Sequence, residues 1–179
     1  MATTTMEERL AAVGRHLDEL ESRARAAPVE ARPRIERHLD ALRGEVASTG
    51  AAVEAEGIMT ETAVSEHGRA IEDRLDQLDK RVEIAGHSLA ADLARDLSSF
   101  TYAVADELEG WGAYLDELGA KAERQQFVAE LRQRRDTLAE RLAEARAASG
   151  ERWDEQKQRV VAAREELEQK ADELGATLR

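Results

Sequence analysis

The fold of this chain is decided by residues 64–122, VSEHGRAIEDRLDQLDKRVEIAGHSLAADLARDLSSFTYAVADELEGWGAYLDELGAKA, in which large apolar residues recur every eleven positions. They form three parallel columns, namely Ile71, Val82, Leu93, Val104 and Leu115; Val64, Leu75, Leu97 and Leu108; and Leu78, Leu89, Phe100 and Trp111. An eleven-residue repeat spans three helical turns of about 3.67 residues each, close to the α-helical value of 3.6. The columns therefore predict one nearly straight apolar face on a long helix.

This face must be covered by other helices. Burying thirteen such side chains contributes on the order of 20 to 40 kcal/mol, whereas ordering about fifty residues costs on the order of 50 to 100 kcal/mol. Small and acidic residues flank the apolar columns, which suits close approach of another helix. We expect an interaction seam made of Ile71, Leu75, Leu78, Val82, Leu89, Leu93, Leu97, Phe100, Val104, Leu108, Trp111 and Leu115.

The composition indicates an all-α protein. Aromatic residues make up 3% of the 179 residues and charged residues 36%, a balance typical of long helices with narrow contact faces. There are two prolines and no cysteines, so disulfides and cysteine-ligated metals are excluded. We expect long amphipathic helices arranged as an elongated antiparallel three-helix bundle or as a coiled-coil assembly, in a single elongated domain over residues 1–179.

The first arm is expected to be a helix over residues 5–56. Thr5 and Glu8 form a capping box at its start. Pro28 and Pro33 coincide with a one-residue slip in the apolar phase, which predicts a kink or a short break between about Ala26 and Pro33. Gly57 to Thr60 then combines a helix-ending glycine with an N-cap residue, so a turn at 57–60 should reverse the chain.

The second arm is expected to be a helix over residues 60–109, followed by helical structure over 113–179. Gly110 and Gly112 favour a second reversal at 110–112, which would give three arms of similar length. The alternative reversal is at 149–150, next to Gly150, and would leave a middle helix long enough to require self-association. Seven-residue spacing after residue 127 indicates left-handed coiled packing of the last part of the chain.

The charge pattern argues against nucleic acid as a partner. The net charge is −12, and residues 61–122 carry 14 acidic but only 6 basic residues. Such a surface repels phosphate backbones and anionic lipid head groups. The start of the chain has acidic residues where a signal peptide would be basic, and no apolar run is as long as a membrane span, so we expect a cytoplasmic protein.

No arrangement of residues predicts catalysis. The histidines are His16, His38, His67 and His87, and none is preceded at three residues by the glutamate that a di-iron helix bundle requires. Paired histidines four apart, as in zinc proteases, and phosphate-binding glycine patterns are also absent from the sequence. We therefore expect no catalytic, cofactor-binding or metal-binding residues and no cofactor.

Two functions follow from this pattern. The first is a non-enzymatic scaffold or interaction protein that binds a second copy or another helical protein through coiled-coil-type packing. The second is a coat on a lipid or granule surface, because the eleven-residue period resembles that of exchangeable apolipoproteins and granule-coating phasins. This resemblance covers only about residues 64–122, and the narrow, acidic-flanked seam favours the scaffold. Tyr102 lies opposite the seam, where it would contact a second helix or anchor a protein partner.

Overall fold

The computed structural model describes residues 2–56, 61–119, 125–148 and 152–177. These residues form an all-α bundle. Its helices are α1 (Ala2–Ala24), α2 (Arg32–Glu56), α3 (Glu61–Leu93), α4 (Leu97–Gly119), α5 (Gln125–Ala147) and α6 (Trp153–Thr177). The expected number of three arms is therefore wrong, because each of them is divided into shorter helices.

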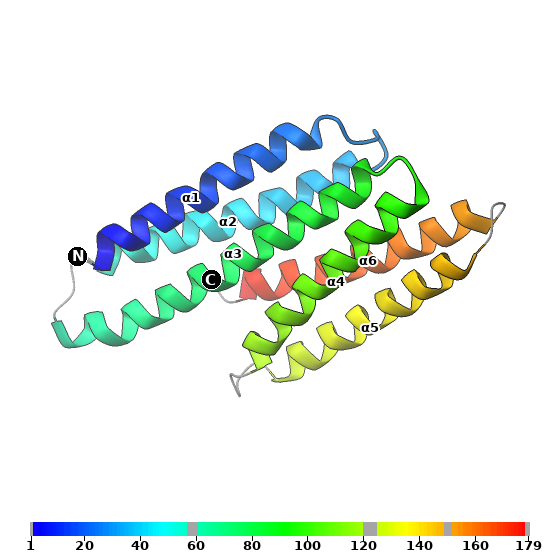
Figure 1. The fold of residues 1–179 in the computed structure, drawn as a ribbon. Coiled ribbons are helices and arrows are strands. Elements are labelled where there is room, and N and C mark those ends of the chain that lie inside the picture. Colours follow the sequence, from blue (N-terminus) through cyan, green and yellow to red (C-terminus); the bar gives the residue numbers. More distant parts are fainter. Residues whose placement is uncertain (1, 57–60, 120–124, 149–151, 178–179) are drawn as a thin grey trace.

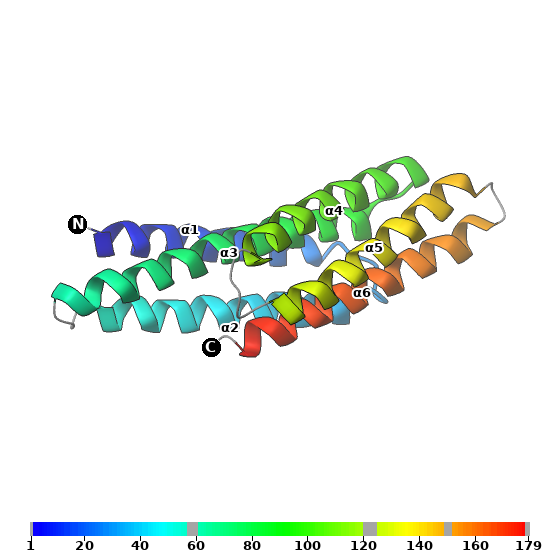
Figure 2. The same ribbon diagram turned by 90° about the horizontal axis from the view of Figure 1, so that it is seen from below.

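The helices are arranged as two units of three, α1–α3 and α4–α6, with consecutive helices running in opposite directions (Figure 1). In the first unit α1, α2 and α3 all pack against one another, and in the second α5 packs against both α4 and α6. The units are joined by packing of α3 on α4 and of α2 on α6. They are staggered lengthwise, so the first turns of α3 and the α5–α6 hairpin extend beyond opposite ends of the shared region (Figure 2).

The two prolines separate two antiparallel helices rather than bending one helix. After α1 ends at Ala24, the amides of Ala26 and Ala27 bond to carbonyls only three residues back, which tightens the chain into a turn. The Arg32 side chain then donates to the backbone oxygens of Ala27 and Arg25, at 3.0 and 3.1 Å. Pro33 lies in the first turn of α2, where a missing N–H costs nothing. The predicted kinked helix over 5–56 is corrected to a helical hairpin.

A second unexpected break divides the predicted helix over 60–109. Helix α3 ends at Leu93, and α4 begins at Leu97 after only three residues. Asp96 caps α4, because its Oδ1 accepts the backbone N–H of Ser99 at 2.8 Å. This bond to the ionised form lowers the pKa of Asp96.

The glycines at 110 and 112 do not reverse the chain. Both lie inside α4, so the predicted turn at 110–112 is wrong. Gly110 instead allows α4 to approach α3 closely, because a Cβ there would lie 2.9 Å from Cγ1 of Ile84. The predicted turns at 57–60 and 149–150 lie outside the described residues.

The bundle has two principal apolar cores. The core of the first unit is formed by residues of α1, α2 and α3, including Leu17, Leu42 and Leu78. The core of the second unit is formed by α4, α5 and α6, together with Ile84 and Ala91 of α3. In the part of the chain that the structure describes, no helix is both long and apolar enough to cross a bilayer.

Candidate functional site

The predicted interaction seam lies inside the chain's own fold. Nine of its twelve residues are buried: Ile71, Leu75, Leu78, Val82 and Leu89 within the first unit, and Phe100, Val104, Trp111 and Leu115 within the second. Leu93 packs at the edge of the first unit's core and Leu108 at the edge of the second's, while Leu97 is half-buried. The large side chains of the seam thus mainly form the apolar cores inside the two units.

Between the two units lies a buried network of charged side chains. Its three arginines are Arg34 on α2, Arg81 on α3 and Arg164 on α6, and all are buried. The carboxylates that pair with them are Glu45, Asp92, Glu107, Glu168 and Asp172, which come from α2, α3, α4 and α6. We call these eight residues, with Ser88 and His38, the inter-unit network.

Arg164 lies at the centre of this network and is 0% exposed. Its Nε donates to Glu107 Oε2 at 2.7 Å, and its Nη1 donates to Asp92 Oδ1 at 3.1 Å. Its Nη2 donates to the backbone oxygen of Ser88 at 2.7 Å and to Ser88 Oγ at 2.5 Å. One guanidinium therefore connects α3, α4 and α6.

Arg34 brings α2 into the same network. It donates to Glu168 Oε2 at 2.6 Å and also to Asp92. Burial alone would raise the pKa of Glu168, but the nearby positive charges, Arg34 foremost, outweigh burial and lower this pKa to about 2. The hydroxyl of Ser88 donates a further bond to Glu168. Glu168 is consequently held ionised in the interior.

Glu107 has the opposite behaviour, although it shares Arg164 with the same network. It is fully buried, and its Oε1 has no hydrogen-bond partner among the described residues. Desolvation therefore raises the pKa of Glu107, even though Arg164 favours the ionised form. The interior thus holds two different carboxyl groups. The surroundings of Glu168 stabilise its ionised form, whereas the burial of Glu107 disfavours its ionised form.

The second arm of the network ends at a histidine. Arg81 pairs with Glu45 and, at 2.5 Å, with Asp172 Oδ1. The same Asp172 oxygen lies 3.0 Å from His38 Nδ1, so a carboxylate fixes the orientation of the imidazole. His38 is 6% exposed, and its Nε2 lacks a partner among the described residues.

An oriented histidine with a free nitrogen is a feature of catalytic and metal sites, and two hollows of different size adjoin His38. The smaller hollow, between Ile35, Ala85 and Leu89, has a volume of about 10 Å³, enough for about one water molecule. Within the described ranges, no group of three or more His, Asp or Glu side chains is arranged to hold a metal ion. The larger hollow has a volume of about 360 Å³, is open to the surface, and is lined by His38 together with Arg34, Arg37, Ala41, Glu165, Glu168, Gln169, Asp172 and Glu173.

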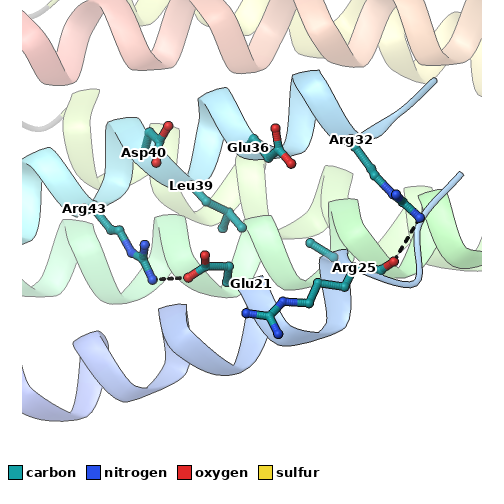
Figure 3. Close-up of a pocket in the computed structure, with 8 residues that line it drawn as sticks. Glu21, Arg25, Arg32, Glu36, Leu39, Asp40 and Arg43 are labelled. Atoms are coloured by element: carbon teal, nitrogen blue, oxygen red, sulfur yellow. Dashed lines mark hydrogen bonds and ion pairs between the residues drawn. The ribbon is translucent and has the colours of Figure 1, made fainter. Parts of the chain in front are cut away.

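The surface carries larger hollows. Figure 3 shows a groove of about 380 Å³ between α1 and α2, which is lined by Glu21, Ala24, Arg25, Arg32, Glu36, Leu39, Asp40 and Arg43. Arg43 pairs with Glu21 across it, and Arg32 is bound to backbone oxygens of the α1–α2 link. The two charge signs are mixed along this groove, so it presents no uniform field to a ligand. Another hollow, open and shallow, lies over α3 and α4 beside Tyr102 and has a volume of about 510 Å³.

Known proteins provide no further assignment. The chain matches no protein-family model, and comparison with curated proteins and with solved structures gives no match. The site must therefore be interpreted from its own residues.

Reasoning from the sequence missed the inter-unit network, although one signal was present. In α6 the apolar residues Val160, Leu167 and Leu174 follow a seven-residue spacing. Arg164 lies four residues after Val160, at a position that faces inward in the same pattern. A charge at such a position indicates a buried partner, but the sequence alone does not say on which helix that partner lies.

Proposed function

We propose that this protein is a non-enzymatic helical scaffold that acts by self-association and by binding other helical proteins. The observation that carries this proposal is that the buried arginines form ion pairs between helices. Arg34, Arg81 and Arg164 are all engaged in ion pairs that connect helices. Side chains employed in this way specify a single arrangement of the bundle, as is described for some buried polar networks.

The closed bundle changes how self-association would occur. Because most seam residues are buried within one chain, copies would have to pair through the outer faces of the helices. Coiled-coil-type packing would then involve exposed helical faces rather than the eleven-residue seam. The chain would then be a stable monomer at low protein concentration and would associate at higher protein concentration.

The test is a direct measurement of mass in solution. Sedimentation equilibrium over a wide range of protein concentrations should give a mass that rises from one chain to an integral multiple of it. A chain that remains monomeric at every concentration would contradict self-association. A binding function would then have to depend on other proteins alone.

A coat on a lipid or granule surface is the second candidate, and one observation favours it. The apolar columns keep their phase across the link at 94–96, where Leu93, Leu97 and Phe100 follow the same eleven-residue pattern. If that link became helical, α3 and α4 would form one long helix with a continuous apolar face. Flotation with neutral and anionic liposomes tests this function: a coat floats with the vesicles and gains helical circular dichroism, whereas a scaffold stays at the bottom of the gradient.

A further inference from the structure

Five buried members of the inter-unit network form a cluster with unequal numbers of positive and negative groups. They pair with one another, their side chains are at most 9% exposed, and they are Arg34, Asp92, Glu107, Arg164 and Glu168. We call these five residues the inner cluster. Arg34 and Asp92 belong to the first unit and the other three to the second, so three carboxyl groups share two guanidinium groups across the junction. With every carboxyl group ionised, the inner cluster would carry one negative charge that no arginine balances.

The neighbouring charged groups that the structure describes are engaged elsewhere. Arg81 pairs with two carboxylates of its own, Glu45 and Asp172. His38 pairs with the same Asp172, its Nδ1 lying 3.0 Å from Oδ1. Helix α5 also packs against α4, but none of the charged residues described on α5 is buried. The imbalance therefore belongs to the inner cluster itself.

The hydrogen bonds show which carboxyl group is least satisfied as an anion. Both oxygens of Asp92 accept a bond, one from Arg34 and the other from Arg164. Both oxygens of Glu168 also accept a bond, one from Arg34 and the other from a serine hydroxyl of α3. Glu107 accepts a bond from Arg164 at 2.7 Å, but its Oε1 has no partner among the described residues. Glu107 is therefore the group on which a proton relieves the imbalance.

We propose that the inner cluster holds one proton on Glu107, and that release of this proton to water as the pH rises separates the two units. With Glu107 protonated, two carboxylates face two guanidinium groups and the cluster is neutral. An ionised Glu107 would instead place a charge with one unpaired oxygen in the dry interior, which is strongly unfavourable. Separation of the units admits water to that oxygen. The inference concerns a single chain and does not depend on the proposed function.

The groups that act on Glu107 give the sign of the pH dependence. Desolvation raises its pKa and the charge of Glu168 acts in the same direction, whereas Arg164 and Arg34 oppose them. Because the pKa of Glu107 is raised in the fold, its contribution to stability is fully present below the ordinary value of 4.5 and is lost as the pH rises through the folded value. A rise in pH therefore favours separation.

Infrared spectroscopy can observe the proton directly. Glu107→Gln replaces the carboxyl by an uncharged group of similar size, and Glu109→Gln makes the same change at an exposed position of α4. At about pH 6.5, carboxyl groups with ordinary pKa values are ionised. The difference spectrum between wild type and Glu107→Gln should then show the C=O band of one protonated carboxyl group. The difference spectrum between wild type and Glu109→Gln should lack this band.

Asp92→Asn tests the charge balance without altering Glu107. It leaves two carboxyl groups for two guanidinium groups, so Glu107 should ionise at a lower pH than in wild type. The infrared band should accordingly disappear at a lower pH in Asp92→Asn. A band that disappears at the same pH in both proteins would overturn the argument from charge balance.

Energy transfer between two dyes measures separation of the units. The chain contains no cysteine, so Ser22→Cys in α1 and Gln133→Cys in α5, both at exposed positions, can carry a donor and an acceptor dye. In otherwise wild-type protein, energy transfer should fall over the pH range in which the Glu107 band disappears, while circular dichroism shows that the helices persist. Glu107→Gln should keep its energy transfer over this range, and Glu109→Gln should behave as wild type.

Urea titrations add a quantitative expectation. Relative to Glu107→Gln, the equilibrium constant for unfolding of the wild type should rise about tenfold for each pH unit above 4.5 until Glu107 ionises, because the folded state holds one more proton than the unfolded state. If Glu107→Gln does not fold, the comparison of Asp92→Asn with wild type still decides the charge balance.

The outcomes are distinct. Absence of a protonated carboxyl band at about pH 6.5 would overturn the proton on Glu107. Loss of the band with unchanged energy transfer would overturn its control of the junction. A fall in energy transfer that also occurs in Glu107→Gln, or that occurs only as the helices unfold, would overturn that control as well.

Discussion

Replacing Arg164 with methionine should strongly destabilise the fold. The substitution removes four donated hydrogen bonds from a fully buried position. Asp92 keeps Arg34 as a partner, but Glu107 loses the only bond shown for its carboxylate. Removing one partner from a buried ion pair costs about 3 to 5 kcal/mol, because the remaining charge is left without compensation. We expect a loss of this size in the free energy of unfolding at neutral pH.

The stability of the Arg164→Met variant should also depend on pH, in a direction set by Glu107. Burial already raises the pKa of Glu107 above its ordinary value of 4.5, and loss of Arg164 removes the main influence that lowers it. A carboxyl whose folded pKa is raised stabilises the fold below its unfolded pKa, and this contribution is lost as the pH rises through the folded pKa. The free energy of unfolding of Arg164→Met, measured by circular dichroism in urea, should therefore decrease relative to wild type as the pH rises above the ordinary glutamate pKa of 4.5.

A double variant distinguishes the stranded charge from a simple packing defect. Combining Arg164→Met with Glu107→Leu removes both partners, and should recover much of the loss. Arg141→Met is the matched control, since Arg141 pairs with Glu144 on the exposed face of α5, and it should cost less than about 1 kcal/mol. The reasoning is refuted if Arg164→Met costs no more than this control, or if the double variant is as unstable as the single one.

Four further substitutions test other parts of the structure. Glu168→Gln should lower the free energy of unfolding by about 3 kcal/mol at neutral pH, because a carboxyl whose pKa is lowered to about 2 in the fold stabilises the fold above its ordinary pKa of 4.5. In urea titrations the difference from wild type should disappear as the pH falls from 4.5 towards 2. Gly110→Ala should lower the free energy of unfolding by about 1 to 3 kcal/mol, because its Cβ would lie 2.9 Å from Ile84. Gly14→Ala in α1 is the control: its Cβ would meet nothing within 4 Å, so it should raise the free energy of unfolding by about 0.5 to 1 kcal/mol. Asp96→Ala removes the N-cap of α4 and should lower the thermal midpoint measured by circular dichroism.

Helical periodicity predicted the class of fold but not where the helices end. The eleven-residue pattern says which residues face inward, and Leu78 and Trp111 are indeed buried. It passes unchanged through the link at 94–96, although Leu89 near the end of α3 lies in the first core and Phe100 near the start of α4 lies in the second. The cap at Asp96 is a local signal of that break, and the apolar phase obscured it.

The roles of the α4 glycines and of the buried charged residues depend on contacts that are distant in sequence. Gly110 and Gly112 of α4 predict a turn from the sequence, yet Gly110 allows close packing against Ile84 of α3, a role that depends on a neighbouring helix. The inter-unit network depends on such distant pairs throughout, as in Arg34 with Glu168. Sequence spacing can place these residues on an inward face, but their partners are set by the packing of the two units.

The division into two units also bears on how the chain is made on the ribosome. Nearly all of the first core comes from residues before Leu93, so it can assemble while α6 is still being synthesised. During that interval the side of α2 and α3 that will meet α6 presents Arg34, Arg81 and Asp92 to water. An intermediate whose exposed flank carries these charges is less prone to aggregate than one with a wholly apolar flank, so we expect the inter-unit network to limit aggregation of the nascent chain.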